Sequence, residues 1–210
     1  MALARLPVLL VAPALALLVP SMAAAQAPPA GIYTLDRAAS AVGFTISGSM
    51  IVKVKRDGIF QEFTGNLSYN PAHPAETQLD LTVYTASVNT HNSEQDHLLK
   101  SSDFFDVEHF PTMRFVSTAV ATNTDGTFSV TGDMTIRGIT KQLIIPVKLR
   151  RSSQDVDHAS PVFESTFQID RTEFGLNGLP KWNGLKVSIS KNIEVRIAMA
   201  TRTGLTPDPL

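Results

Sequence analysis

The chain has 210 residues, with 18 Lys and Arg against 19 Asp and Glu, 43% hydrophobic residues and no cysteine. This composition supports a folded core in one large domain or two small ones, and it excludes a mainly disordered chain. The balanced charge argues against a general nucleic-acid binder, and the absence of cysteine excludes disulfides, thiol nucleophiles and metal–thiolate sites.

Residues 1–25 have the order of a cleaved secretory signal peptide. Arg5 supplies a positive charge, an apolar run covers 6–18, and three alanines at 23–25 provide the cleavage site. The run is shorter than the roughly 20 residues of a membrane span, so an anchor is the less favoured alternative. We therefore expect a single mature domain of residues 26–210 that works in the periplasm without stable insertion into a membrane.

Apolar and polar residues alternate through the mature chain, which is typical of half-buried strands. The clearest stretch is 128–136, and a turn at 137–141, around Gly138, joins it to the next stretch. Because an unpaired buried charge is costly, Lys191 predicts that the last strand bends or begins at 190–192. The eight stretches are 42–46, 63–69, 79–83, 113–117, 128–136, 143–149, 163–169 and 193–199.

One stretch breaks the alternation. Residues 93–99 begin with Ser-x-x-Asp and end in Leu98 and Leu99, which predicts a short capped helix. Phe104 and Phe105 follow closely. This segment is either a lid over a cavity or a plug that fills one end of the core.

These elements predict an all-β fold. Eight long antiparallel strands with few helices to cover them lose their free edges most simply by closing into a barrel. An eight-stranded barrel either packs solid or holds one ligand.

Five stretches resemble the YceI-like family of secreted bacterial lipid-binding proteins, and they follow the family's order over about residues 31–200. They are YTLD at 33–36 with ASAVGFTI at 39–46, GIFQEFTG at 58–65, SEQDHLLKSSDFFDVEHFPTMRF at 93–115, VTGDMTIRGITK at 130–141 and IDRTEFGL at 169–176. The resemblance implies an extended, eight-stranded, lipocalin-like antiparallel β-barrel with one short helix or lid. It also implies that a polyisoprenoid chain, of the quinone or polyprenyl kind, is bound inside.

The chain departs from the family's usual pattern near the opening strand. Ala39 and Ser47 stand where the family usually or often has His, which leaves the preferred head group of the ligand open. The stretch 48–57 is longer than the family's usual link, and we expect it to form a strand extension or a flap.

The candidate ligand site is the inner wall of the barrel. A ten-residue strand spans about 33 Å, so an isoprenoid of several units fits along it, and each buried CH₂ contributes roughly 0.8 kcal/mol. Any one of these residues could equally be ordinary core. The predicted lining is Phe44, Phe63, Leu81, Val83, Met113, Phe115, Phe128, Met134, Phe163 and Phe167, with Leu98, Leu99, Phe104 and Phe105 as lid residues.

Arg171 is the candidate contact for a polar head group. The alternative is an ion pair with Asp170 and Glu173 that holds the turn.

Catalytic signals are weak. The sequence has neither a Gly-x-Ser-x-Gly elbow nor a phosphate-binding glycine loop. His91, Glu94, His97 and His109 could be drawn as a metal cluster, but their spacing matches no standard zinc site. We expect these residues to be solvated.

Three functions compete. The favoured one is a binding or carrier protein for an isoprenoid or other long-chain lipid, with no enzymatic activity and no cofactor. The alternatives are a metal-assisted enzyme acting on a lipid-like substrate, and a structural or stress-related barrel that binds a partner protein and has a solid interior. Exposed strand edges leave a homodimer open.

Overall fold

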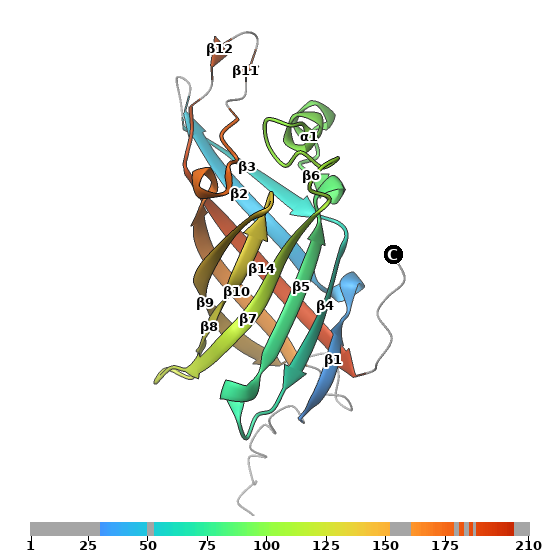
Figure 1. Ribbon diagram of the computed structural model, residues 1–210, viewed down its shortest axis with the longest axis vertical. Coiled ribbons are helices and arrows are strands. Elements are labelled where there is room, and N and C mark those ends of the chain that lie inside the picture. Colours follow the sequence, from blue (N-terminus) through green and yellow to red (C-terminus); the bar gives the residue numbers. More distant parts are fainter. Residues whose placement is uncertain are drawn as a thin grey trace, which may run out of the picture.

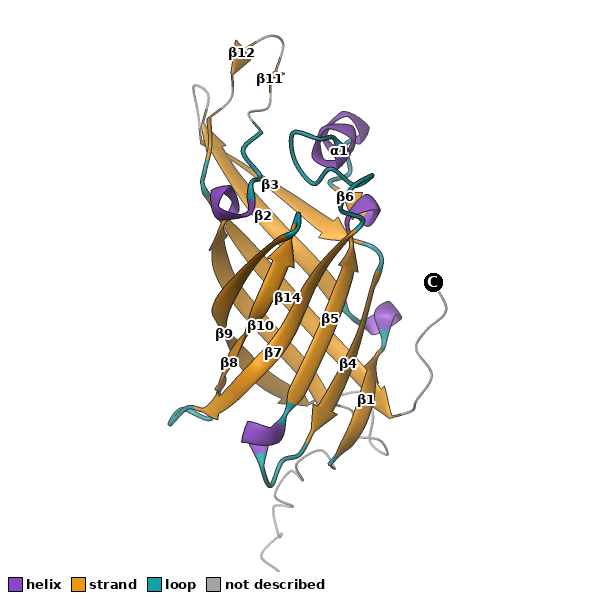
Figure 2. Cartoon of the chain, in the orientation of Figure 1, coloured by secondary structure: helices purple, strands orange, loops and turns teal. Residues whose placement is uncertain are grey.

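A computed structural model of the chain describes residues 30–49, 53–151, 161–178, 181–182, 185–186 and 188–203 (Figures 1 and 2). The predicted signal peptide at 1–25 lies outside these residues. The strands are β1 (Gly31–Leu35), β2 (Ala41–Ser49), β3 (Lys53–Phe60), β4 (Phe63–Tyr69), β5 (Gln78–Tyr84), β6 (Val88–Asn89), β7 (Thr112–Thr122), β8 (Phe128–Ile136), β9 (Ile139–Arg151), β10 (Pro161–Asp170), β11 (Lys181–Trp182), β12 (Leu185–Lys186), β13 (Ser188–Ile189) and β14 (Asn192–Thr203). The helices are η1 (Arg37–Ala39), η2 (Pro74–Glu76), η3 (Thr85–Ser87), α1 (Ser93–Lys100) and η4 (Arg171–Phe174).

Eight strands form a closed antiparallel barrel. Their order around the ring is β1, β4, β5, β7, β8, β9, β10 and β14, and β14 closes the ring by pairing with β1. The predicted all-β barrel with one short helix is therefore confirmed. No helix in the described part of the chain is long and apolar enough to cross a membrane.

The barrel is extended at one end by strands that continue the ring after a bend. β14 pairs with β1 through Thr201–Thr203 and with β2 through Glu194–Ala198, and η1 separates β1 from β2. β3 pairs with β2 and β6. Among the described strands, β6 and β7 do not pair, and the segment 90–111 with α1 connects them. Figure 1 shows α1, β11, β12 and the β2–β3 tip at this same end, which we call the α1 end.

All eight predicted stretches lie in strands: β2, β4, β5, β7, β8, β9, β10 and β14. β14 begins at Asn192, as the position of Lys191 predicted. The turn between β8 and β9 is tighter than the expected 137–141. Arg137 and Gly138 alone form it, both with left-handed φ, 53° and 73°, which suits a two-residue hairpin.

The helix prediction needs one correction, because Ser93 is not the cap. The side chain of Asn92 accepts a hydrogen bond from the Gln95 N–H at 3.0 Å and caps α1. Asp96 instead accepts from the backbone and hydroxyl of Thr90, at 2.7 and 2.6 Å.

Two inward-facing glycines allow aromatic rings to lie flat against the barrel wall. A Cβ on Gly58 would lie 2.3 Å from the ring of Phe44, and one on Gly132 would lie 2.4 Å from the ring of Phe115. A side chain at either position would push the ring out of place. Phe44 and Phe115 therefore depend on a glycine in the neighbouring strand.

Candidate functional site

An apolar cavity of about 100 Å³ lies at the α1 end of the barrel. Its wall comes from strand residues, from the segment 90–111 between β6 and β7, which we call the lid segment, and from η4 and the loop after it. Eleven of the fifteen predicted site residues line it: Phe44, Leu81, Val83, Leu99, Phe104, Phe105, Met113, Phe115, Met134, Phe167 and Arg171.

The other four predicted residues lie elsewhere. Phe128 and Phe163 line a second, smaller cavity of about 30 Å³, together with Tyr69. Phe63 is buried in the core, and Leu98 is half-buried and packs against it. The prediction therefore mixed residues from two separate cavities with ordinary core residues.

The sequence analysis missed twelve residues of the main cavity. Most follow the inward alternation already recognised, so a complete reading of each strand would have included them. Phe60, Leu176 and Ile189 lie outside the predicted stretches. The missed residues are Val42, Gly43, Ile46, Phe60, Arg114, Ile136, Ile169, Leu176, Ile189, Ile193, Val195 and Ile197.

Aromatic packing keeps the cavity small. The rings of Phe44 and Phe60 lie 5.5 Å apart between centroids, and Phe105 meets Phe60 edge-on at the same distance. At about 100 Å³ the cavity is smaller than an engineered cavity of about 150 Å³ that binds benzene. Phe105 lines the cavity and packs against Phe60, an arrangement that suits a lid over the cavity and a plug in the end of the core alike.

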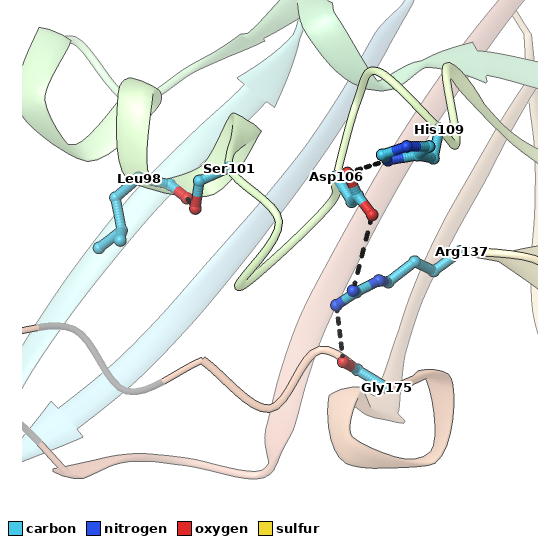
Figure 3. A network of polar contacts seen from close by, with 6 residues as sticks. All are labelled: Leu98, Ser101, Asp106, His109, Arg137 and Gly175. Carbon is cyan, nitrogen blue, oxygen red and sulfur yellow. Dashed lines mark hydrogen bonds and ion pairs between the residues drawn. The ribbon is translucent and has the colours of Figure 1, made fainter.

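Polar contacts hold the lid segment to two other loops (Figure 3). Arg137 Nη1 donates to the carbonyl oxygen of Gly175 at 3.0 Å, and Arg137 Nη2 lies 3.8 Å from Asp106 Oδ2. The Arg137 guanidinium also lies 6.0 Å from the ring centroid of Phe110. The turn between β8 and β9 thus joins the lid to the loop after η4, and we call this set of contacts the lid latch.

His109 adds a titratable group to the lid latch. Its Nδ1 lies 2.8 Å from Asp106 Oδ1, and this hydrogen bond raises the pKa of the His109 imidazole. The His109 side chain is 73% exposed, whereas Asp106 is only 14% exposed. The carboxylate of Asp106 therefore faces one exposed imidazole and one partly buried guanidinium.

The end of the lid segment is held by the protein backbone. Thr85, which is fully buried, donates from its hydroxyl to the carbonyl oxygen of Phe110 at 2.8 Å. Its N–H donates to the carbonyl oxygen of Pro111 at 2.9 Å. The mobile portion of any lid movement must therefore lie before residue 110.

Arg171 lies in the wall of the main cavity and is only 6% exposed. Its Nε donates to the carbonyl oxygen of Ser190 at 3.0 Å and its Nη1 to that of Leu176. Burial lowers the pKa of its guanidinium. Among the described residues, Arg171 forms no salt bridge within 4 Å.

The expected ion pair of Arg171 with Asp170 and Glu173 does not form at salt-bridge distance, although the charges of Arg171 and Asp170 attract each other. Asp170 instead accepts from the N–H and hydroxyl of Thr172, at 2.8 and 2.5 Å, and caps η4. Glu173 is exposed. The short side chain of Asp170 precedes η4 and accepts hydrogen bonds from the first turn of that helix. These local hydrogen bonds compete with a salt bridge to Arg171.

The histidines do not form a metal centre in the part of the chain that the structure describes, since no three His, Asp or Glu side chains there are grouped to hold an ion. His109 pairs with Asp106 rather than with His91 or His97.

Comparisons with known proteins agree with this fold. A UPF0312 protein of Ectopseudomonas mendocina is 37% identical over 98 residues, covering 47% of this chain and 51% of that protein. One of Pseudomonas putida is 33% identical over 122 residues, covering 58% of this chain and 64% of that protein. The matched region of this chain thus spans between half and two thirds of the length of these relatives.

Solved structures share the architecture. BcnA of Burkholderia cenocepacia matches with a TM-score of 0.68 and 24% identity, over 80% of this chain and 99% of BcnA. A polyisoprenoid binding domain of Saccharophagus degradans matches with a TM-score of 0.61 and 15% identity, over 82% and 98% of the two chains. Both likenesses concern the fold. Because the model of the YceI-like domain matches residues 33–201, this chain belongs to the YceI-like family.

Proposed function

We propose that this protein binds the apolar chain of an isoprenoid lipid inside its barrel and acts as a carrier or reservoir, without catalysis. The observation that carries the proposal is the composition of the main cavity wall. Apart from Arg114 and Arg171, every side chain that lines it is apolar. A similar fold in a protein named for polyisoprenoid binding supports the same reading.

Binding requires the lid segment to move. The cavity of about 100 Å³ takes only a short part of an isoprenoid, whereas displacement of Phe104 and Phe105 joins it to the solvent side of the α1 end. Each CH₂ that then becomes buried contributes roughly 0.8 kcal/mol, so a chain of several units offsets the loss of the lid contacts.

Arg171 is the proposed contact for a polar head group. A guanidinium has five N–H donors, and two of those on Arg171 serve Ser190 and Leu176. The remaining donors can meet a carbonyl or phosphate oxygen of the ligand. Arg171→Lys keeps the charge but loses the planar fork, so it should weaken binding of a lipid with such a group and leave binding of a plain hydrocarbon chain unchanged.

We also propose that the protein works in the periplasm as one domain of residues 26–210 after cleavage of 1–25. The composition of 1–25 supports this proposal. The N-terminal sequence of the protein recovered from its native host tests it, because an intact Met1 in an exported protein contradicts cleavage.

Solvent extraction and mass spectrometry of the purified protein test ligand binding, followed by titration of the extracted protein with quinone and polyprenyl analogues. Val83→Phe should abolish retention because Val83 lines the main cavity. Val130→Phe is the matched control, since Val130 lines the second cavity. Each replacement overpacks a core and costs about 1–3 kcal/mol, so both melting temperatures should fall similarly. Absence of retained lipid, with no affinity for either analogue, would favour a purely structural barrel.

A further inference from the structure

Basic residues are concentrated in two segments at the α1 end. Segments 46–56 and 177–192 contain six of the 18 Lys and Arg residues and none of the 19 Asp and Glu residues. The other twelve basic residues share the rest of the chain with all the acidic ones. A chain with almost no net charge therefore has one strongly cationic region.

The two segments lie side by side in the fold. β13 pairs with the end of β2, with Ser188 opposite Ser49 and Ile189 opposite Gly48. The Ser190 N–H donates to the carbonyl oxygen of Ser47 at 2.7 Å. Figure 1 shows β11 and β12, which carry Lys181 and Lys186 in their sequence, beyond the β2–β3 tip.

Four cations of this region are exposed: Lys53, Lys55, Arg56 and Lys191, which we call the basic rim. None of the four has an ion-pair partner among the described residues. The neighbouring acid, Asp57, is already engaged by Thr45 and by Arg196, whose Nη2 lies 2.9 Å away. Asp57 attracts Lys55, and Asp170 attracts Lys191, without forming salt bridges to them. The four exposed cations of the basic rim thus outnumber these two acids, both of which also hydrogen-bond to other residues, and the rim can attract an external anionic surface.

The basic rim adjoins the main cavity. Ile46, which lines the cavity, pairs across β2 and β3 with Arg56. Ile189 also lines the cavity and lies two residues before Lys191. An anionic surface that contacts the rim therefore lies close to the cavity wall.

We propose that the basic rim docks the α1 end onto an anionic lipid bilayer. The proposal rests on the proposed function, because an isoprenoid ligand resides in membranes and must otherwise cross water with its chain exposed. Contact at the rim allows the ligand to pass between bilayer and cavity without that exposure. The acidic residues Glu94, Asp103 and Glu108 lie in the lid segment, where an anionic membrane repels them. The side of the α1 end that carries the basic rim therefore approaches the membrane first, and the lid segment stays away from it.

Vesicle flotation tests the proposal with the purified protein. Vesicles that mix phosphatidylglycerol with phosphatidylcholine should bind it, vesicles of phosphatidylcholine alone should not, and added salt should weaken the binding. Each cation lost near the surface lowers the partition coefficient about fivefold, so Lys53→Glu/Lys55→Glu should lower it by at least about 25-fold. Lys148→Glu/Arg150→Glu changes the net charge equally on the outer wall of β9 and should leave binding unchanged.

Several outcomes overturn the proposal. They are equal binding to both kinds of vesicle, equal loss in the two double variants, or capture by heparin or an acidic protein with no vesicle binding. The failure of the proposed function is distinguishable, because it appears as absence of retained lipid whatever the vesicles do. If the proposed function holds, Lys53→Glu/Lys55→Glu still binds a quinone analogue added from detergent.

Discussion

Arg137 is the residue whose loss should open the lid. Arg137→Gln removes the charged hydrogen bond to Gly175, worth about 1.5 kcal/mol, and the contacts with Phe110 and Asp106, worth about 0.5 kcal/mol each. Their combined loss of about 2.5 kcal/mol raises the population of the open lid about 60-fold, since every 1.4 kcal/mol is tenfold.

Amide hydrogen exchange measures this opening directly. The N–H of Phe105 donates to Leu99 and that of Phe110 to Asp106, at 3.0 and 2.8 Å, so both amides report on the lid segment. Their exchange should accelerate about 60-fold in Arg137→Gln, while amides in the β10–β14 ladder keep their protection. A bound lipid should also dissociate faster.

Arg150→Gln is the matched control. Arg150 pairs with Glu164 on the barrel exterior, where both side chains are substantially exposed, so its loss should cost little. Unchanged exchange of Phe105 in Arg137→Gln would refute the lid latch. Equal acceleration across every strand would also refute it, because that result means global destabilisation rather than local opening.

Three further predictions concern smaller parts of the structure. Gly132→Ala should destabilise the fold by about 1–3 kcal/mol in urea unfolding, because its Cβ would meet the ring of Phe115 at 2.4 Å; wild-type stability would contradict the close contact. Asn92→Ala should lower the free energy of unfolding by about 1 kcal/mol and speed amide hydrogen exchange in α1, whereas Ser93→Ala should do neither. A larger effect of Ser93→Ala than of Asn92→Ala would instead make Ser93 the cap. The raised pKa of His109 means that its contribution to lid protection is complete below its ordinary value of 6.5 and is lost as the pH rises through the raised pKa. Protection factors measured across this range should show that loss in the wild type and lack it in His109→Gln.

The alternation of apolar residues predicted the barrel because each barrel strand has one solvent-exposed face and one buried face. The expected strand extension at 48–57 is present in its described residues, where β2 continues to Ser49 and β3 begins at Lys53. β3 is not among the eight alternating stretches because Lys55 and Arg56 make both of its faces polar where it extends beyond the ring. β1 was recognised only through the family resemblance, since its last three residues are all buried and the segment shows no alternation.

The candidate site was predictable as a set of inward faces but not as a volume. Whether Phe44, Phe60 and Phe105 leave a wide tunnel or a small cavity depends on ring packing between distant segments, which alternation does not encode. The partners of Arg171 are likewise backbone carbonyls of loops that come together only in the fold. Local sequence suggested its acidic neighbours instead.

The missing ladder between β6 and β7 makes the two ends of the barrel mechanically unequal. Widening the far end requires breaking main-chain hydrogen bonds somewhere around a complete circumference. Spreading β6 from β7 breaks no such bonds between them and disturbs only side-chain contacts and the segment that joins the two strands. The barrel can therefore widen at the α1 end at a lower energetic cost than at the opposite end.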